Sequence, residues 1–400
     1  MSTVERLARR NFVLVCIAQF CLALAISIIE PLLPIYVASF GVSYAVVGFV
    51  MSSFGLTRVF VEIPGGILTD RFGRRPVLLV GFALAMSSHL LAGFAQSYLE
   101  LIIARMIVGA GSALAMIAGV IYVSEISSPS HRQQDIARYQ SMWSMGGILG
   151  PTLGGLLSDN FGIRFIFFTA VGITCIGIII VLRIQFSQKT ILSRDTIQRS
   201  QLIALIKNPI ILVLCTATFI TFFMYSSIRG TMIPLYGVDI LQLTSTQIGI
   251  VFSITSLVTV IGLNVLVPRL EVIISRQQLL VLSLATCVFA VTIISATSNF
   301  LTLALTAVPL GIGFSLLQPT PFTMILDTAH PENRGLMVGL LRTTGDIGII
   351  VGPILVGGLL DIGFIHNIFY VIAGIIGIFT CISWMIFYQT KHRLTSSSRK

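Results

Sequence analysis

Charged residues are scarce in this sequence. Of its 400 residues only 10% are Asp, Glu, Lys or Arg, whereas 55% are hydrophobic. Soluble domains carry about 25% charged residues, so this chain has too few to cover a surface that faces water. The composition therefore excludes an ordinary soluble fold and indicates that lipid surrounds most of the protein.

Cysteine pairs, metal-binding clusters and catalytic motifs are missing as well. The six cysteines all fall inside apolar stretches at no paired spacing, so we expect neither disulfides nor a metal site. No G-x-x-x-x-G-K-[ST] loop occurs, which argues against ATP-driven transport by this chain alone. We expect no cofactor and no enzyme activity. An alternative to a membrane transporter is a membrane enzyme or a non-transporting receptor. That alternative would need a catalytic constellation, which the sequence lacks.

Apolar stretches long enough to cross a bilayer recur along the chain. A spanning helix needs about 20 mostly apolar residues, and twelve stretches meet this length. The first is too long for the core of a signal peptide, so we expect an uncleaved helix there. The predicted spans are 11–37, 44–68, 77–96, 99–124, 138–158, 163–184, 209–238, 244–267, 278–297, 300–325, 335–360 and 365–388.

The distribution of Lys and Arg predicts the orientation. Short cytoplasmic loops are enriched in these residues, and placing both termini in the cytoplasm puts 20 of the 25 basic residues inside and only Arg164 outside. The remaining four lie within predicted helices. The net charge of +10 thus reflects topology rather than nucleic-acid binding. We expect a multi-pass protein of the cell membrane that acts as a monomer.

The two halves of the sequence resemble each other. Gly109 and Pro151 recur 202 residues later as Gly311 and Pro353, and the stretches that follow the two prolines can be aligned. A repeat near half the chain length is typical of transporters; chance similarity between apolar stretches is the alternative.

The predicted fold is an all-α membrane protein with twelve transmembrane helices in two pseudo-symmetric six-helix bundles. The bundles are predicted at 1–184 and 209–400, with a cytoplasmic linker at 185–208 and a short basic C-terminal tail.

The connector after the second predicted helix carries the most specific motif. It reads GGILTDRFGRRP and resembles the signature G-x-L-x-D-R-x-G-R-R of the major facilitator superfamily. The glycines permit a tight turn, and the charges predict a small ionic latch on the cytoplasmic face. The resemblance implies that Glu125 pairs with a signature arginine and that Asp70 faces the start of the eleventh helix, where a helix N-terminus favours an anion. For Glu125 a solvated loop charge is the alternative. The latch residues are Gly66, Asp70, Arg71, Gly73, Arg74, Arg75 and Glu125.

The matching connector in the second half is less complete. Arg276 aligns with Arg74, but Val272 replaces the aspartate. We therefore assign the latch to the first half only.

The fifth predicted helix carries a second motif. Its sequence GGILGPTLGG resembles the G-x-x-x-G-P-x-x-G-G signature that this superfamily associates with antiporters, especially drug–proton exporters. Small residues allow close helix packing, and proline permits a bend. A generic packing seam is the alternative. The motif residues are Gly146, Gly150, Pro151, Gly154 and Gly155.

Seven charged residues lie within predicted helices. A lone charge at mid-bilayer costs about 3 kcal/mol on the insertion scale, so these residues must pair or face water. Glu30 and Arg105 fall at similar depth in the first and fourth helices. We interpret Glu30 as the protonatable acid and Arg105 as its partner; a permanent structural ion pair is the alternative.

Four of these charges predict a gate between the halves. Arg58 and Glu62 in the second helix match the depths of Asp346 and Arg342 in the eleventh, which the superfamily fold places alongside. Because the two charges of each helix are four residues apart, pairing within one helix is the alternative.

Arg229 has two possible roles, binding an anionic group or balancing the charge of Glu30. We assign it to substrate binding with Tyr36 and Tyr236.

Together these features predict a proton-coupled secondary transporter that works by alternating access. We interpret it as an exporter of drugs or other small, partly hydrophobic molecules. A symporter or facilitator for a small metabolite, such as a sugar or an organic acid, is the alternative.

Overall fold

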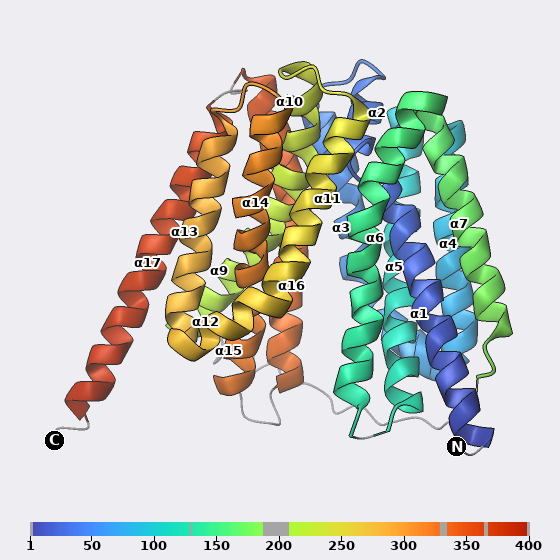
Figure 1. Ribbon diagram of the computed structural model, residues 1–400, viewed down its shortest axis with the longest axis horizontal. Helices are drawn as coiled ribbons and strands as arrows, with labels where there is room; N and C mark the ends of the chain where they lie inside the picture. The colour runs from blue at the N-terminus through green and yellow to red at the C-terminus, as the bar shows by residue number, and fades with distance from the viewer. Residues whose placement is uncertain (1–2, 129, 187–207, 329–333, 364–366, 398–400) are drawn as a thin grey trace. The chain divides into compact units, whose positions relative to one another are not determined.

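The computed structural model describes residues 3–128, 130–186, 208–328, 334–363 and 367–397. This part of the chain is built almost entirely from helices (Figure 1). The helices of the first half are α1 (Thr3–Ile29), α2 (Leu33–Ala38), α3 (Tyr44–Phe72), α4 (Arg74–Phe94), α5 (Tyr98–Ile126), α6 (Arg132–Phe161) and α7 (Ile163–Arg183). Those of the second half are α9 (Pro209–Met224), η1 (Tyr225–Met232), α10 (Ile233–Asp239), α11 (Ser245–Ile261), η2 (Gly262–Leu266), α12 (Val267–Ile273), α13 (Arg276–Ile294), α14 (Phe300–Leu317), α15 (Thr320–Thr328), α16 (Arg334–Asp361) and α17 (Ile368–Ser397).

Helices lie at all twelve predicted spans, and the fold is that of an all-α membrane protein. Eleven helices in the described ranges are long and apolar enough to cross a membrane. The predicted span at 138–158 is not among the eleven, although α6 is a continuous helix of 30 residues there. Charged side chains in its first turns and many glycines and serines in the remainder lower its hydropathy.

Large apolar side chains lie exposed along the outer faces of these helices. On α17, Ile375, Ile378, Ile382 and Met385 are 60%, 65%, 46% and 60% exposed, respectively, and their spacing places them on one face of the helix. A soluble protein rarely exposes a continuous apolar face of this kind. Such faces are suited to contact with lipid.

The chain divides into two compact units. The first comprises Met1–Ser193 together with Gly230–Ser253, and the second comprises Arg194–Arg229 together with Ile254–Lys400. Residues 230–253, which the sequence analysis assigns to the second bundle, thus pack with the first unit. The predicted linker lies almost entirely outside the described residues.

The core of the first unit is formed by α1, α4, α5 and α7, with buried side chains such as Leu22, Phe82 and Val181. At its centre α4 and α5 touch through their backbones. A Cβ on Gly81 would lie 2.7 Å from the carbonyl oxygen of Gly111, and a Cβ on Gly111 would lie 2.6 Å from that of Gly81. Close approach through small residues gives van der Waals contact, which stabilises helix pairs in lipid.

The first predicted span is broken near its C-terminal end. The sequence predicts one helix over 11–37, whereas α1 ends at Ile29 and α2 begins at Leu33. Pro31 and Pro34 cause this difference, because proline has no N–H to donate and its ring clashes with the carbonyl four residues earlier. Glu30 therefore lies in a turn between two helices rather than inside one.

Two spans of the second half contain π-helical segments before a proline. Pro234 follows η1 and Pro268 follows η2 within two residues. Each proline leaves a carbonyl without its usual donor, and a π-helical segment is one way for a helix to accommodate that loss. Such segments are frequent at functional sites, and η1 holds Arg229.

Candidate transport site

Glu30 and Arg105 lie within electrostatic range of each other in the first unit. Glu30 is partly buried in the turn between α1 and α2, and its charge interacts with the guanidinium of Arg105 on α5. The Arg105 Cζ also lies 4.7 Å from the centre of the Phe54 ring on α3. The helix break thus places an acid beside a cation that stays charged at any physiological pH. The assignment of Glu30 to proton coupling remains a prediction.

Phe54 is in contact with two arginines, and the sequence analysis did not identify it. The Cζ of Arg58 lies 5.6 Å from the centre of its ring, so the guanidiniums of Arg58 and Arg105 share one aromatic side chain. Gly109 permits this approach of α5 to α3, because a Cβ there would lie 2.5 Å from the Phe54 carbonyl oxygen. Contacts of this type contribute about 0.5–2 kcal/mol each. The available sequence signal was the position of Phe54 one helical turn before Arg58.

The predicted gate residues of α3 pair with each other. Arg58 Nη2 lies 3.0 Å from Glu62 Oε1, with 15% and 20% of the two side chains exposed. This is the pairing within one helix that the sequence analysis kept as an alternative. Arg342 and Asp346 belong to the other unit, and the ion pairs between the halves remain a prediction.

The latch residues meet at the junction of α3 and α4. Gly73 adopts a φ of +89° there, a conformation that favours glycine. Arg74 forms a bidentate ion pair with Glu125 of α5, with 3.1 Å between Nε and Oε2, and lies 3.7 Å from Asp70. The aspartate and the glutamate therefore share one arginine.

The other two signature arginines lie in different surroundings. Arg75 donates a hydrogen bond of 3.2 Å to the carbonyl of Leu182 at the end of α7. The Arg71 Cζ lies 5.4 Å from the centre of the Phe72 ring.

The second half contains an ion-pair cluster of its own. Arg276 pairs with Asp327, and its Nε lies 3.5 Å from Glu271. Arg276 and Asp327 lie 202 residues after Arg74 and Glu125, respectively. Val272 stands at the position equivalent to Asp70 and has no carboxylate, but the adjacent Glu271 provides one. The second half thus has an ion-pair cluster at the equivalent position, and the assignment of the latch function to the first half stays a prediction. A position-by-position alignment compares Asp70 with Val272 and overlooks Glu271. The longer side chain of Glu271 reaches Arg276 from the neighbouring position.

One face of the motif in α6 packs against α1. A Cβ on Gly146 would lie 2.7 Å from the Ala23 side chain, and a Cβ on Gly150 would lie 2.6 Å from that of Ser27. A Cβ on Gly154 would overlap the Ile28 carbonyl. Any larger residue at these positions separates the two helices.

A different face of the same motif packs against the first turns of α11. A Cβ on Gly155 would overlap the carbonyl oxygen of Ser245, and a Cβ on Gly249 would overlap that of Pro151. The contact is reciprocal, because each helix contributes the glycine that the other helix needs. We call this contact the α6–α11 seam.

Asp159, at the C-terminal end of α6, extends the α6–α11 seam. Its carboxylate accepts hydrogen bonds from the backbone N–H groups of Ser245 and Thr246, at 3.1 and 2.8 Å. Partial burial raises the pKa of Asp159, but the hydrogen bonds from Thr246 and Ser245 outweigh it and hold the pKa below its ordinary value. Asp159 follows the predicted span, and the sequence analysis did not single it out.

The two tyrosines assigned to substrate binding are buried in the first unit. Tyr36 donates a hydrogen bond of 3.3 Å to the Ala95 carbonyl and accepts one of 3.2 Å from Arg164. Its hydroxyl is thus held by α7 and by the end of α4. Tyr236 lies in α10 and is also buried. Substrate binding by this pair remains a prediction.

Arg229, the third residue assigned to substrate binding, is 1% exposed in η1 of the second unit. Its Nη2 donates to Ser256 Oγ at 3.1 Å, and its Cζ lies 4.7 Å from the centre of the Tyr225 ring. A buried guanidinium on a π-helical segment is a strong candidate for recognition, and which of its two proposed roles it fills stays open.

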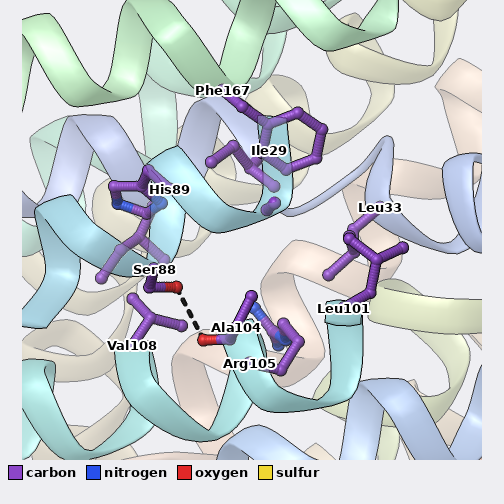
Figure 2. Close-up of a pocket in the computed structure, with 11 residues that line it drawn as sticks. Ile29, Leu33, Ser88, His89, Leu101, Ala104, Arg105, Val108 and Phe167 are labelled. Carbon is purple, nitrogen blue, oxygen red and sulfur yellow. Dashed lines mark hydrogen bonds between the residues drawn. The ribbon is translucent and has the colours of Figure 1, made fainter. Parts of the chain in front are cut away.

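A cavity adjoins Arg105 (Figure 2), and the space of about 330 Å³ between its atoms includes space open to solvent. It lies among α1, α2, α4, α5 and α7, and its polar side chains are Ser88, His89 and Arg105. His89 is 3% exposed, and the sequence analysis did not identify it. The available signal was a single histidine in the otherwise apolar span predicted at 77–96.

The sequence matches the profile of the Major Facilitator Superfamily over residues 15–292 and 214–400. The chain belongs to the major facilitator superfamily. This facilitator is therefore a secondary transporter of small molecules across a membrane and not an enzyme.

Curated relatives resemble most of this facilitator's length. It is 26% identical to Multidrug resistance protein 2 of Bacillus subtilis over 357 residues, which covers 88% of this chain and 89% of the relative. It is 24% identical to Quinolone resistance protein NorA of Staphylococcus aureus over 345 residues, covering 86% and 88%.

Solved structures share the fold of this facilitator at low identity. A POT family transporter in complex with a thioalcohol-conjugated peptide matches with a TM-score of 0.80 and 12% identity, covering 96% of both chains. The nucleoside transporter NupG matches with a TM-score of 0.79 and 14% identity, covering 95% of this chain and 100% of that one. At these identities the likeness shows the fold alone.

Proposed function

We propose that this facilitator is a proton-coupled antiporter of the cell membrane that exports drugs or other small, partly hydrophobic molecules. Both termini would lie in the cytoplasm, which the enrichment of Lys and Arg in the connectors on that side supports. Family membership establishes transport, whereas the coupling ion, the direction and the substrate class belong to the proposal.

The position of Glu30 beside Arg105 carries the proposal. Interrupted transmembrane helices commonly hold the coupling and substrate sites of secondary transporters, and Glu30 lies in such an interruption. A proton on Glu30 removes the negative charge that balances Arg105. A buried cation without its counter-charge is costly, so the two protonation states favour different arrangements of the surrounding helices.

Two further observations support the exporter class. Relatives whose names refer to multidrug and quinolone resistance cover most of this chain. The glycine–proline motif of α6, which resembles an antiporter signature, forms contacts on two faces. One of these faces packs against α1, and the other packs against the first turns of α11.

Proton movement in membrane vesicles tests the direction of coupling. Inverted vesicles with an acidic lumen would receive ethidium, an aromatic cation, and the pH of the lumen would be followed with a fluorescent dye. An antiporter takes up ethidium and releases protons, so the lumen becomes less acidic. A symporter moves both inward and acidifies the lumen. Acidification on adding substrate, or no proton movement during uptake, would contradict the proposal.

A further inference from the structure

The cavity beside Arg105 is mostly apolar. Eight of its eleven lining residues are Ile, Leu, Ala, Val or Phe. The three polar residues come from adjacent helices: Ser88 and His89 from α4, and Arg105 from α5. These three residues supply the polar side chains that an occupant of the cavity can bond to.

Ser88 already has a partner, whereas the other two polar residues each have a bonding atom unused. Ser88 donates a hydrogen bond of 2.6 Å to the Ala104 carbonyl (Figure 2). His89 Nε2 and Arg105 Nε are both buried, and neither has a hydrogen-bond partner within the described portion of the chain. Buried polar atoms are almost always satisfied by protein or by ordered water.

The chemistry of these two atoms limits what can occupy the cavity that both residues line. Arginine Nε–H only donates, so the occupant must offer a lone pair, whereas histidine Nε2 either donates or accepts. An apolar group satisfies neither atom, and a cation would meet the Arg105 charge. An anion would compete with Glu30, whose charge already acts on Arg105. A water molecule meets both demands, and it needs only about 30 Å³.

We propose that a water molecule bound in this cavity bridges Arg105 Nε and His89 Nε2, and that His89 thereby positions Arg105 for its interaction with Glu30. The second half of this inference rests on the proposed function; the water site does not. His89 is a positioning residue, because it acts on the coupling acid only through the arginine.

The bridge complements the other contacts of Arg105. The Arg105 guanidinium lies over the Phe54 ring of α3, and Glu30 supplies an opposite charge. When a proton neutralises Glu30, the ring and the water-mediated bond to His89 still hold the guanidinium in place. No other titratable side chain lines the cavity among the residues that the structure describes: α1, α2 and α7 contribute only apolar side chains to it.

The first test is a crystallographic or cryo-EM map of the whole protein that resolves ordered water. We expect one peak within about 3.2 Å of both Arg105 Nε and His89 Nε2. A map without a peak there, or with a peak bonded to only one of the two atoms, would overturn the water bridge. In either case the result does not depend on transport, so it separates this inference from the proposed function.

The second test compares variants by the pH dependence of ethidium transport in proteoliposomes. His89→Leu removes the bridge, so Arg105 stabilises the Glu30 carboxylate less well. The pH midpoint of transport should then rise by about half a unit, a threefold change in proton concentration. His89→Gln keeps a hydrogen-bonding group and should restore most of the wild-type profile.

Thr174→Val is the matched control for these variants. It removes a buried hydroxyl from α7 that bonds only within its own helix, so the pH midpoint should stay unchanged. Equal midpoints in wild type and His89→Leu, or an equal shift in Thr174→Val, would overturn the positioning role. If His89→Leu does not fold, His89→Gln and the map decide. Proton-driven transport that persists in Glu30→Gln would contradict the proposed function but would not bear on the water site.

Discussion

The carboxylate of Asp159, at the end of α6, accepts a hydrogen bond of 2.8 Å from the backbone N–H of Thr246 in the first turn of α11. One helix thus caps the N-terminus of another, where the helix dipole favours a negative charge. The Gly155 and Gly249 contacts lie in the same α6–α11 seam. Packing and electrostatics therefore act on the same pair of helices.

Asp159→Asn should weaken the α6–α11 seam in a pH-dependent way. The folded-state pKa of Asp159 lies below its ordinary value, which is about 3.9. The stabilisation is therefore fully present above the ordinary pKa and is lost as the pH falls through the lower folded-state pKa. Asparagine has one acceptor oxygen where aspartate has two, so thermal unfolding in detergent should show a loss of about 1 kcal/mol for the variant at pH 7. The difference from wild type should shrink toward pH 3; a difference that does not change with pH would contradict this assignment.

Gly155→Ala should impair both stability and transport. The added Cβ overlaps the Ser245 carbonyl oxygen, so α6 and α11 must separate. Overpacking of this kind costs about 1–3 kcal/mol. Gly172→Ala on α7 is the control, because a Cβ there meets nothing within 4 Å. Equal unfolding temperatures for the two variants would show that the seam tolerates separation.

The two ion-pair clusters, around Arg74 and around Arg276, should contribute differently to the stability of the protein. Glu125→Gln leaves Arg74, only 12% exposed, without its main partner, whereas Asp327→Asn affects a pair whose members are 38% and 58% exposed. Exposed pairs contribute at most about 1 kcal/mol, while loss of a partly buried partner costs more. Thermal unfolding should rank Glu125→Gln as the more damaging change. The reverse order would mean that burial does not govern these clusters.

Two charge swaps distinguish the alternatives for the gate. If Arg58 and Asp346 pair between the halves in one state of the transport cycle, Arg58→Asp with Asp346→Arg should restore part of the transport that either single change removes. If Arg58 and Glu62 pair only within α3, as in this structure, Arg58→Glu with Glu62→Arg should restore it instead. Transport rates of the four single and two double variants decide between them. If only Arg58→Glu with Glu62→Arg restores transport, the predicted gate between the halves is wrong.

Much of the fold follows from one-dimensional patterns in the sequence. Apolar stretches of sufficient length mark the spans, because in a bilayer the backbone must satisfy its own hydrogen bonds and a helix does so within one segment. The pairing of Glu125 with a signature arginine was expected from the resemblance to the superfamily's loop signature, and in the structure this arginine is Arg74. The spans, by contrast, depend on local composition along the chain.

The missed features depend on three-dimensional contacts. The break at Glu30 follows from Pro31 and Pro34, yet proline inside an apolar stretch often leaves a membrane helix continuous. Phe54 and His89 gain their roles only from side chains on neighbouring helices. Spacing along the chain places Phe54 one helical turn before Arg58, but it does not show that Arg105 of another helix meets the same ring, or which histidine nitrogen will lack a partner.

Proton coupling through Glu30 is tested most directly by separating two modes of transport in proteoliposomes. Glu30→Gln would be compared with Glu100→Gln, which changes an acid that caps the backbone N–H of Gln96 at the start of α5. We expect Glu30→Gln to abolish ethidium uptake driven by a pH gradient while exchange of labelled for unlabelled ethidium continues. Glu100→Gln should retain both modes. Wild-type uptake driven by the pH gradient in the Glu30→Gln protein would contradict the account.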